Sequence, residues 1–163
     1  MAEERDDPEA FYLLEATRHN GKSMTLEDNE GYVTLFAVLP LLPGMAPYYY
    51  DAIEHMAQVY KYTLVPMILP IAVDDSNLKS LPQRPDGKTI LLQNGGVNNP
   101  VLQYLLSRKM VAGNAEIQFS LDRPTIFLVS HTGMFIERLV APTMEVMERR
   151  LKVHEWAMSK EDL

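Results

Sequence analysis

The chain contains no cysteine. It can therefore form no disulfide, offer no thiolate nucleophile and supply no cysteine ligand to a metal ion. It also has no apolar run near the 18 residues that predict a membrane-spanning helix, and its longest such run, residues 35–43, is broken by prolines. These absences exclude dithiol chemistry and predict a protein without a transmembrane span.

Basic charge is scarce as well, with 15 Lys and Arg against 22 Asp and Glu and a net charge of −7. Much of the acidic excess lies in the first nine residues, which include Glu3, Glu4, Asp6, Asp7 and Glu9. The remaining chain is mildly acidic and lacks the basic stripe that a phosphate backbone requires, so we expect no nucleic-acid partner. The acidic start opposes both a secretory signal and an arginine-rich transit peptide, and we expect an intracellular protein.

The residues that usually carry metals and catalysis form no recognisable constellation. The four histidines, His19, His55, His131 and His154, are scattered and include no pair at ligand spacing. No Ser-His-Asp arrangement can be argued, and the Gly95-Gly96 segment lacks the Lys and Ser/Thr of a phosphate loop. We therefore expect no metal site, no cofactor and no catalytic residues.

What the chain does contain is an ordinary globular composition, with 47% hydrophobic and 23% charged residues in a length of 163. We expect an acidic flexible tail over residues 1–9, one domain over residues 10–158 and a short C-terminal tail over residues 159–163. The domain is organised around the stretch TLFAVLPLLPGMAPYYY, residues 34–50. This stretch predicts a buried strand, a tight Pro/Gly loop and the first turn of a helix.

The hydrophobic pattern predicts a mixed α/β order along the chain. Strands are expected at residues 11–16, 23–26, 32–39, 64–69, 89–93, 125–129 and 134–140, and helices at 47–62, after Asn99-Pro100 and at 143–156. Asn20-Gly21 and Ser130–Gly133 predict the turns of two hairpins. The strand, helix and strand over residues 32–69 predict a right-handed parallel βαβ unit. Together these segments suggest a sheet with four to five core strands.

The helix expected at residues 47–62 is amphipathic. Its inward face contains Tyr49, and Glu54 falls with the other polar residues on the outward face. The three consecutive tyrosines, residues 48–50, span too much of the helix circumference for one face to bury them all. Either Tyr48 or Tyr50 is therefore expected to be exposed, and the sequence leaves open which.

Several stretches resemble glutathione peroxidases in the order that the family has them. They cover about residues 10–155 and read AFYLLEATRHNGKSMTLEDNEGYVTLFAVL, GMAPYYYDAIEHMAQVYK, LVPMILP, NPVLQYLLSRK and TIFLVSHTGMFIERLVAPT. The resemblance implies an α/β fold of the thioredoxin-like (glutathione peroxidase-like) type. Such a fold has a mixed sheet flanked by helices and an N-terminal β-hairpin.

The same resemblance implies that the catalytic groups of the family have been lost. The family uses a cysteine or selenocysteine held by a glutamine, a tryptophan and an asparagine. The nucleophile's position matches Pro43, and the glutamine's position falls at about Val73. The Trp-Asn pair falls on Asp122 and Arg123, or after a small shift on residues 119–120, which are Phe and Ser. Peroxide reduction needs an atom that accepts oxygen and is then reduced, and proline has none.

One segment resembles thioredoxins more than glutathione peroxidases. Arg123-Pro124-Thr125 enters a strand at the place where thioredoxins have a cis-proline. A cis X-Pro bond costs only about 0.5–1 kcal/mol over trans, so the sequence leaves the isomer of Arg123–Pro124 open. A cis bond there would expose backbone with which a peptide could pair.

These observations favour a catalytically inactive protein that serves as a structural or protein-interaction subunit of a larger assembly. Its partners would be other proteins, and its compartment cytoplasmic or mitochondrial. The alternative is a module that binds a peptide or a small glutathione-like ligand in the vestigial active-site groove. The candidate residues of that groove are Leu42, Pro43, Gly44, Met45, Asp122, Arg123 and Pro124. An enzyme with different chemistry is disfavoured, because no nucleophile or base can be named.

Overall fold

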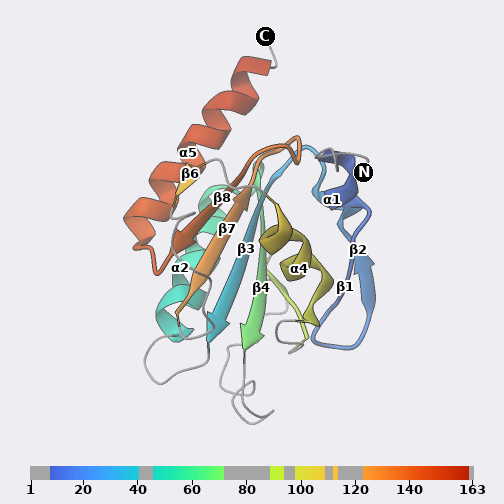
Figure 1. Ribbon diagram of the computed structural model, residues 1–163. Helices are drawn as coiled ribbons and strands as arrows, with labels where there is room; N and C mark the ends of the chain where they lie inside the picture. Colours follow the sequence, from blue (N-terminus) through green and yellow to red (C-terminus); the bar gives the residue numbers. More distant parts are fainter. Residues whose placement is uncertain are drawn as a thin grey trace.

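The computed structural model describes residues 8–40, 46–71, 89–93, 98–108, 112–113 and 123–161. Two small strands form an N-terminal hairpin, and the other strands form one six-stranded mixed sheet with the order β5-β4-β3-β7-β8-β6 (Figure 1). The strands are β1 (Glu15–Thr17), β2 (Ser23–Thr25), β3 (Val33–Pro40), β4 (Leu64–Ile71), β5 (Ile90–Leu91), β6 (Ala112–Gly113), β7 (Thr125–Val129) and β8 (Ile136–Val140). The helices are α1 (Pro8–Tyr12), the 3-10 helix η1 (Leu26–Asn29), α2 (Ala46–Val59), α4 (Pro100–Ser107) and α5 (Met144–Glu161).

The centre of the sheet is the parallel pair of β3 and β4. Their register runs without interruption from Val33 opposite Leu64 to Pro40 opposite Ile71, and α2 makes the crossover between them. On its other side β3 pairs with the antiparallel strand β7. This arrangement confirms the predicted βαβ unit and the mixed sheet. The sheet exceeds the expected four to five strands because two-residue strands, β5 and β6, pair at its edges.

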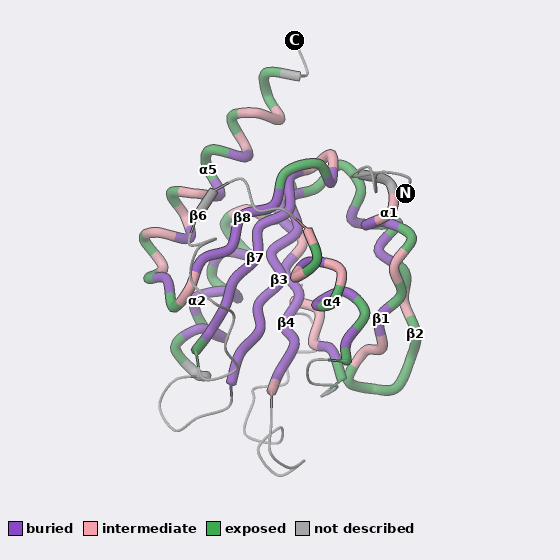
Figure 2. Tube along the Cα trace, in the orientation of Figure 1, coloured by how far each residue is buried: buried purple, intermediate pink, exposed green. Residues whose placement is uncertain are grey.

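Every residue of β3 is buried, because helices cover both faces of the sheet (Figure 2). One core layer lies on the side of α2 and α5 and includes Leu35 and Ala37 from β3. The other lies on the side of α4 and the N-terminal hairpin and includes Phe36 and Val38. Burial on both faces explains why β3 is a continuous apolar run and does not alternate.

The N-terminal hairpin forms at the predicted turn but begins later than predicted. β1 pairs antiparallel with β2, and Gly21 in the turn has a φ of 86°, which favours glycine. The predicted first strand at residues 11–16 was wrong at its start, because Phe11 and Tyr12 belong to helix α1. Both side chains are buried against the α4 layer. A short apolar run fits a helix or a strand equally well, so tertiary burial decides which of the two this segment forms.

Helix α4 begins as the sequence predicts. Asn99 is its N-cap, and the Asn99 side-chain oxygen accepts hydrogen bonds from the backbone N–H of Val101 at 2.9 Å and of Leu102 at 3.1 Å. Pro100 occupies the first turn, where its missing N–H would have no helical partner.

Helix α2 is buried over a wider arc than predicted. Glu54 was expected on the outward face, but it is buried, and its Oε1 has no hydrogen-bond partner. Among the three tyrosines, Tyr49 and Tyr50 are buried and Tyr48 is half-exposed, which settles the alternative that the sequence left open. The charge of Glu54 suggested an exposed position, whereas its place beside the buried residues Ile53 and Ala57 decides its burial.

The closing helix α5 ends at Glu161, beyond the predicted end near residue 156, and its last turns project past the sheet (Figure 1). None of the helices in the described ranges is long and apolar enough to cross a bilayer.

A cluster of charged side chains that we did not predict joins α5 to β8 through hydrogen bonds. The Glu137 carboxylate on β8 is 2% exposed and accepts hydrogen bonds from Arg150 Nε at 2.8 Å and Arg150 Nη2 at 2.9 Å. The Nε2 atom of His154, one turn further along α5, lies 2.9 Å from Glu137 Oε1. Arg150 and His154 are four residues apart and therefore share a helix face. The signal in the sequence was a glutamate within the strand-like run IERLV.

The electrostatics of this cluster favour an ionised Glu137. Burial raises the pKa of Glu137, but the hydrogen bonds and charges of His154 and Arg150 outweigh burial and lower the pKa from 4.5 to about 2. A carboxyl group whose pKa is lower in the folded state binds its proton more tightly in the unfolded state. Its stabilisation is therefore full above the unfolded pKa of about 4.5 and is lost as the pH falls toward 2.

We predict that Glu137→Gln destabilises the protein at pH 7 by roughly 3 kcal/mol and by progressively less as the pH falls from 4.5 toward 2. Urea unfolding of both proteins at a series of pH values measures this difference. The matched control is Glu145→Gln, the same substitution at an exposed position of α5, which should alter stability by less than about 0.5 kcal/mol at every pH. A Glu137→Gln effect that stays constant between pH 7 and pH 3 would contradict the assigned role.

Candidate functional site

The candidate site lies at the carboxyl end of β3, where the chain leaves the sheet to enter α2. β3 ends at Pro40 and α2 begins at Ala46. Strand β7 brings a second segment to the same place, because Thr125 pairs with Val38 and Pro124 precedes Thr125. The strand-to-helix junction and the Pro124 segment therefore meet at one end of the sheet, which is where the sequence placed the vestigial groove.

Most of the predicted groove residues lie outside the described ranges. These are Leu42, Pro43, Gly44, Met45 and Asp122, together with Val73, Phe119 and Ser120, which were matched to the family's glutamine and Trp-Asn positions. Of the predicted set, the structure describes Arg123 and Pro124. Arg123 is exposed and Pro124 is buried.

The Arg123–Pro124 bond is trans, since the described residues include no cis peptide bond. The carbonyl of Pro124 accepts a hydrogen bond of 2.8 Å from the backbone N–H of Ala141. The connection between β8 and α5 therefore occupies a backbone acceptor of Pro124, at the carboxyl end of β3.

That connection is held tightly against the start of α2. The Tyr49 hydroxyl donates to the carbonyl of Pro142 at 2.8 Å, and the hydroxyl of Tyr48 accepts from the backbone N–H of Met144 at 3.2 Å. Ala141, which directly precedes Pro142, has a φ of 46°, in the left-handed region that non-glycine residues rarely adopt. Two tyrosines of α2 thus fix a strained turn next to the candidate site.

The described groups at this site supply structural hydrogen bonds. Burial, and to a smaller extent Tyr48, raises the pKa of Tyr49, so its hydroxyl stays protonated near neutral pH and acts as a donor. The sequence has no cysteine, and serine, histidine and acidic residues are absent from residues 34–50. Within the described ranges, no group of three or more His, Asp or Glu side chains could hold a metal ion. The thiol chemistry typical of this junction cannot occur here.

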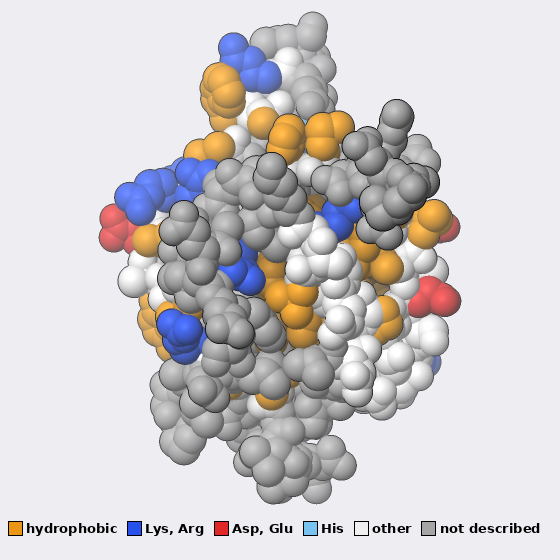
Figure 3. All heavy atoms as spheres, in the orientation of Figure 1, with side chains coloured by type: hydrophobic (Ala, Val, Ile, Leu, Met, Phe, Trp, Pro, Cys, Tyr) orange, Lys and Arg blue, Asp and Glu red, His pale blue; other side chains and the backbone are white. Residues whose placement is uncertain are grey.

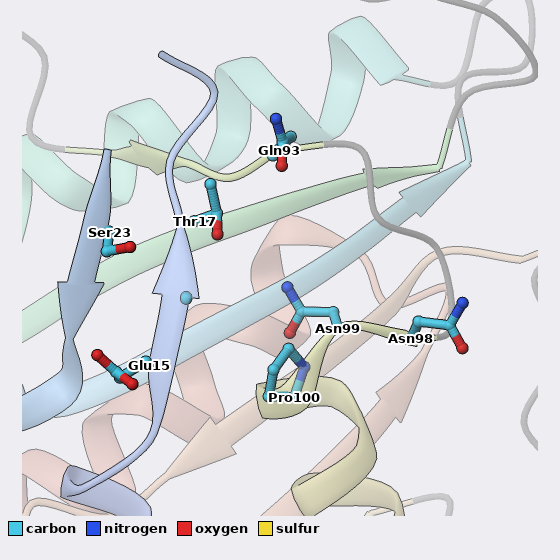
Figure 4. Close-up of a pocket in the computed structure, with 8 residues that line it drawn as sticks. Glu15, Thr17, Ser23, Gln93, Asn98, Asn99 and Pro100 are labelled. Carbon is cyan, nitrogen blue, oxygen red and sulfur yellow. The ribbon is translucent and has the colours of Figure 1, made fainter. Parts of the chain in front are cut away.

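A cavity of about 370 Å³ lies at a different place, between the hairpin and the start of α4. Its lining includes Thr17 and Ser23 from the hairpin, Gln93 after β5, and Asn99 at the start of α4, with their polar groups around the opening in Figure 4. The oxygen of Asn99 is already used to cap α4. The lining also includes one acidic residue, Glu15, beside apolar residues, and this combination does not indicate a particular chemistry.

Large hydrophobic side chains are exposed at the opposite end of the sheet, away from the junction. Tyr62 is 79% exposed and Trp156 is 63% exposed, with Val59 at 55% and Val153 at 45%. The two aromatic residues flank a hydrogen bond from the Thr63 hydroxyl to the Glu155 carboxylate, so they lie on adjoining segments. Figure 3 shows hydrophobic and basic side chains together on the projecting end of α5. We call Val59, Tyr62, Val153 and Trp156 the α2–α5 patch.

Comparison with known proteins gives matches among solved structures alone. No protein-family model and no curated protein sequence matches the chain. The glutathione peroxidase Trgpx in its apo form has a TM-score of 0.61 and 17% identity, over 89% of this chain and 95% of that one. T. cruzi GPX1 has a TM-score of 0.60 and 18% identity, over 86% of this chain and 93% of that one.

Disulfide oxidoreductases are similar to a comparable degree. A secreted Mycobacterium tuberculosis disulfide oxidoreductase, homologous to E. coli DsbE, has a TM-score of 0.62 and 8% identity, over 88% of this chain and 98% of that one. At these identities the likeness concerns the fold. The chain therefore has a thioredoxin-like α/β fold similar to that of glutathione peroxidases, as its sequence predicted, and it has this fold without a cysteine.

Proposed function

We propose that the protein is a catalytically inactive member of the glutathione peroxidase-like group and acts as a structural or protein-interaction subunit of a larger assembly. The scaffold is that of proteins that work through a reactive sulfur, and this chain has no cysteine to supply one. A protein can keep its fold after it has lost its catalytic residues, because the same fold can carry many different functional sites. What the scaffold still offers is a surface.

The α2–α5 patch is the observation that carries this proposal. Tyrosine and tryptophan are enriched in protein–protein interfaces and among the residues that dominate binding energy. Tyr62 and Trp156 are the most exposed aromatic side chains among the described residues. A cation lies over each ring, with Lys61 Nζ 5.2 Å from the Tyr62 ring centre and Lys160 Nζ 5.0 Å from the Trp156 ring centre. The patch therefore combines apolar area with positive charge.

We predict that the double variant Tyr62→Ala, Trp156→Ala stays folded but no longer binds the other proteins of the assembly. Both side chains are exposed, so unfolding free energy should change by less than about 0.5 kcal/mol per substitution. Loss of a residue that dominates an interface costs about 2 kcal/mol or more, which is about 30-fold in affinity. Size-exclusion chromatography and quantitative mass spectrometry of tagged chains purified from native extract measure the assembly and its stoichiometry.

The matched control is Leu13→Ala, which removes an exposed apolar side chain after α1. The control should assemble like the wild type. Recovery of the wild-type chain as a lone monomer would count against the proposal as a whole. If the double variant assembles as well as the wild type does, the α2–α5 patch is not the binding surface.

The vestigial groove is the basis of the alternative proposal, a site for peptide or glutathione-like ligands. Leu42, Pro43, Gly44, Met45, Asp122, Arg123 and Pro124 would line it. The hydrogen bond between Pro124 and Ala141 favours the first proposal, because it occupies a backbone acceptor that a peptide could use. We expect glutathione to leave the melting temperature unchanged up to millimolar concentration. A saturable rise in melting temperature that Arg123→Gln abolishes would establish the alternative.

A further inference from the structure

Two cationic residues, the half-buried Arg18 and the exposed Lys22, lie near the tip of the N-terminal hairpin. In the hairpin register Ala16 lies opposite Met24, and both contribute to the core layer on the side of α4. The backbone hydrogen bond from Arg18 N–H to the Lys22 carbonyl, 2.8 Å long, extends this pairing by one step. Because side chains alternate between the faces of a strand, Arg18 and Lys22 fall on the same inward face as Ala16 and Met24.

These two residues line a cavity of about 400 Å³ between the hairpin and the β4–β5 edge of the sheet. Met24, Val65 and Ile90 supply its apolar wall, and Asp28 lines it from η1. Small-molecule sites in proteins commonly measure about 300–1,000 Å³ and combine apolar walls with a few polar groups. The cavity matches that description in both size and lining.

Among the described residues, no hydrogen-bond acceptor contacts the buried Nε of Arg18 in this cavity lining. Buried polar groups are almost always hydrogen-bonded, and a buried donor on a charged group is costly to leave unpaired. Among the described residues, neither the Arg18 guanidinium nor the Lys22 ammonium group forms an ion pair. The cavity is therefore lined by two cationic residues and one acidic residue, Asp28, a balance that suits an anionic ligand.

We propose that this cavity binds a small ligand through an oxyanion, a carboxylate or phosphate group held by Arg18 and Lys22. A guanidinium presents a planar set of donors that suits the oxygens of both groups. Two cations and the carboxylate of Asp28 leave a single net positive charge, which suits one negative charge on the ligand. The apolar wall suits a short hydrocarbon part. The site is separate from the vestigial groove, because Val65 lies near the amino end of β4 and the groove lies at the carboxyl end of β3.

An NMR titration of the ¹⁵N-labelled full chain tests the proposal, with sodium butyrate, inorganic phosphate and sodium chloride at constant ionic strength. We expect butyrate or phosphate to cause saturable shifts of the Arg18 Nε–H signal and of the amides of residues 18–28, 65 and 90. Chloride should cause none that saturate. Comparison of the two oxyanions shows which group the site prefers. Arg18→Gln should weaken binding by about tenfold or more, because it removes charge-assisted hydrogen bonds.

Two further variants keep the test decisive if Arg18→Gln does not fold. Lys22→Gln changes an exposed side chain and should weaken binding while leaving the spectrum well dispersed. Arg149→Gln removes the same charge from the exposed face of α5 and should leave the affinity unchanged. The proposal is overturned if neither oxyanion produces saturable shifts, or if Lys22→Gln and Arg149→Gln weaken binding equally, which would indicate general charge screening.

Discussion

The structure depends on one pairing, the parallel contact of β3 with β4 over their whole length. Parallel neighbours require a crossover, and α2 supplies it. Both strands are buried by layers on either face, so the sheet needs α5 beside α2 on one side and α4 with the hairpin on the other. The same pairing places the turn from β3 into α2 at the carboxyl end of the sheet, beside Pro124. The sequence resemblance placed the vestigial groove at this turn, and the chain has no cysteine to supply a reactive sulfur there.

Much of this arrangement could be predicted because short sequence patterns with one clear structural meaning determine it. A continuous apolar run predicted the strand β3, and the Asn99-Pro100 pair predicted the start of helix α4. Gly133 predicted the turn between β7 and β8. The errors arose where tertiary contacts override local pattern. Phe11 and Tyr12 form a helix because they pack against α4, and Glu54 is buried because α2 is covered over a wide arc.

The candidate sites could be predicted less well, for a different reason. The loss of sulfur chemistry follows from composition, so it was visible at once. The contact of Glu137 with Arg150 and His154 joins a strand to a helix, and spacing along the chain reveals only the helical half of it. The cavity at Arg18 and Lys22 depends on which face of the hairpin meets the sheet. An Asn-Gly turn predicts a hairpin, and it leaves open which side of that hairpin faces the core.

A measurement of hydroperoxide reduction by the purified chain tests the central claim most directly. The claim is that the protein has the fold of thiol-dependent enzymes and no peroxidase activity. Hydrogen peroxide and an organic hydroperoxide would be supplied with glutathione, or with thioredoxin and its reductase, and a cysteine-containing glutathione peroxidase would serve as the positive control. We predict a rate equal to that of buffer at every protein concentration. Saturable turnover that rises in proportion to the amount of this chain would contradict the account.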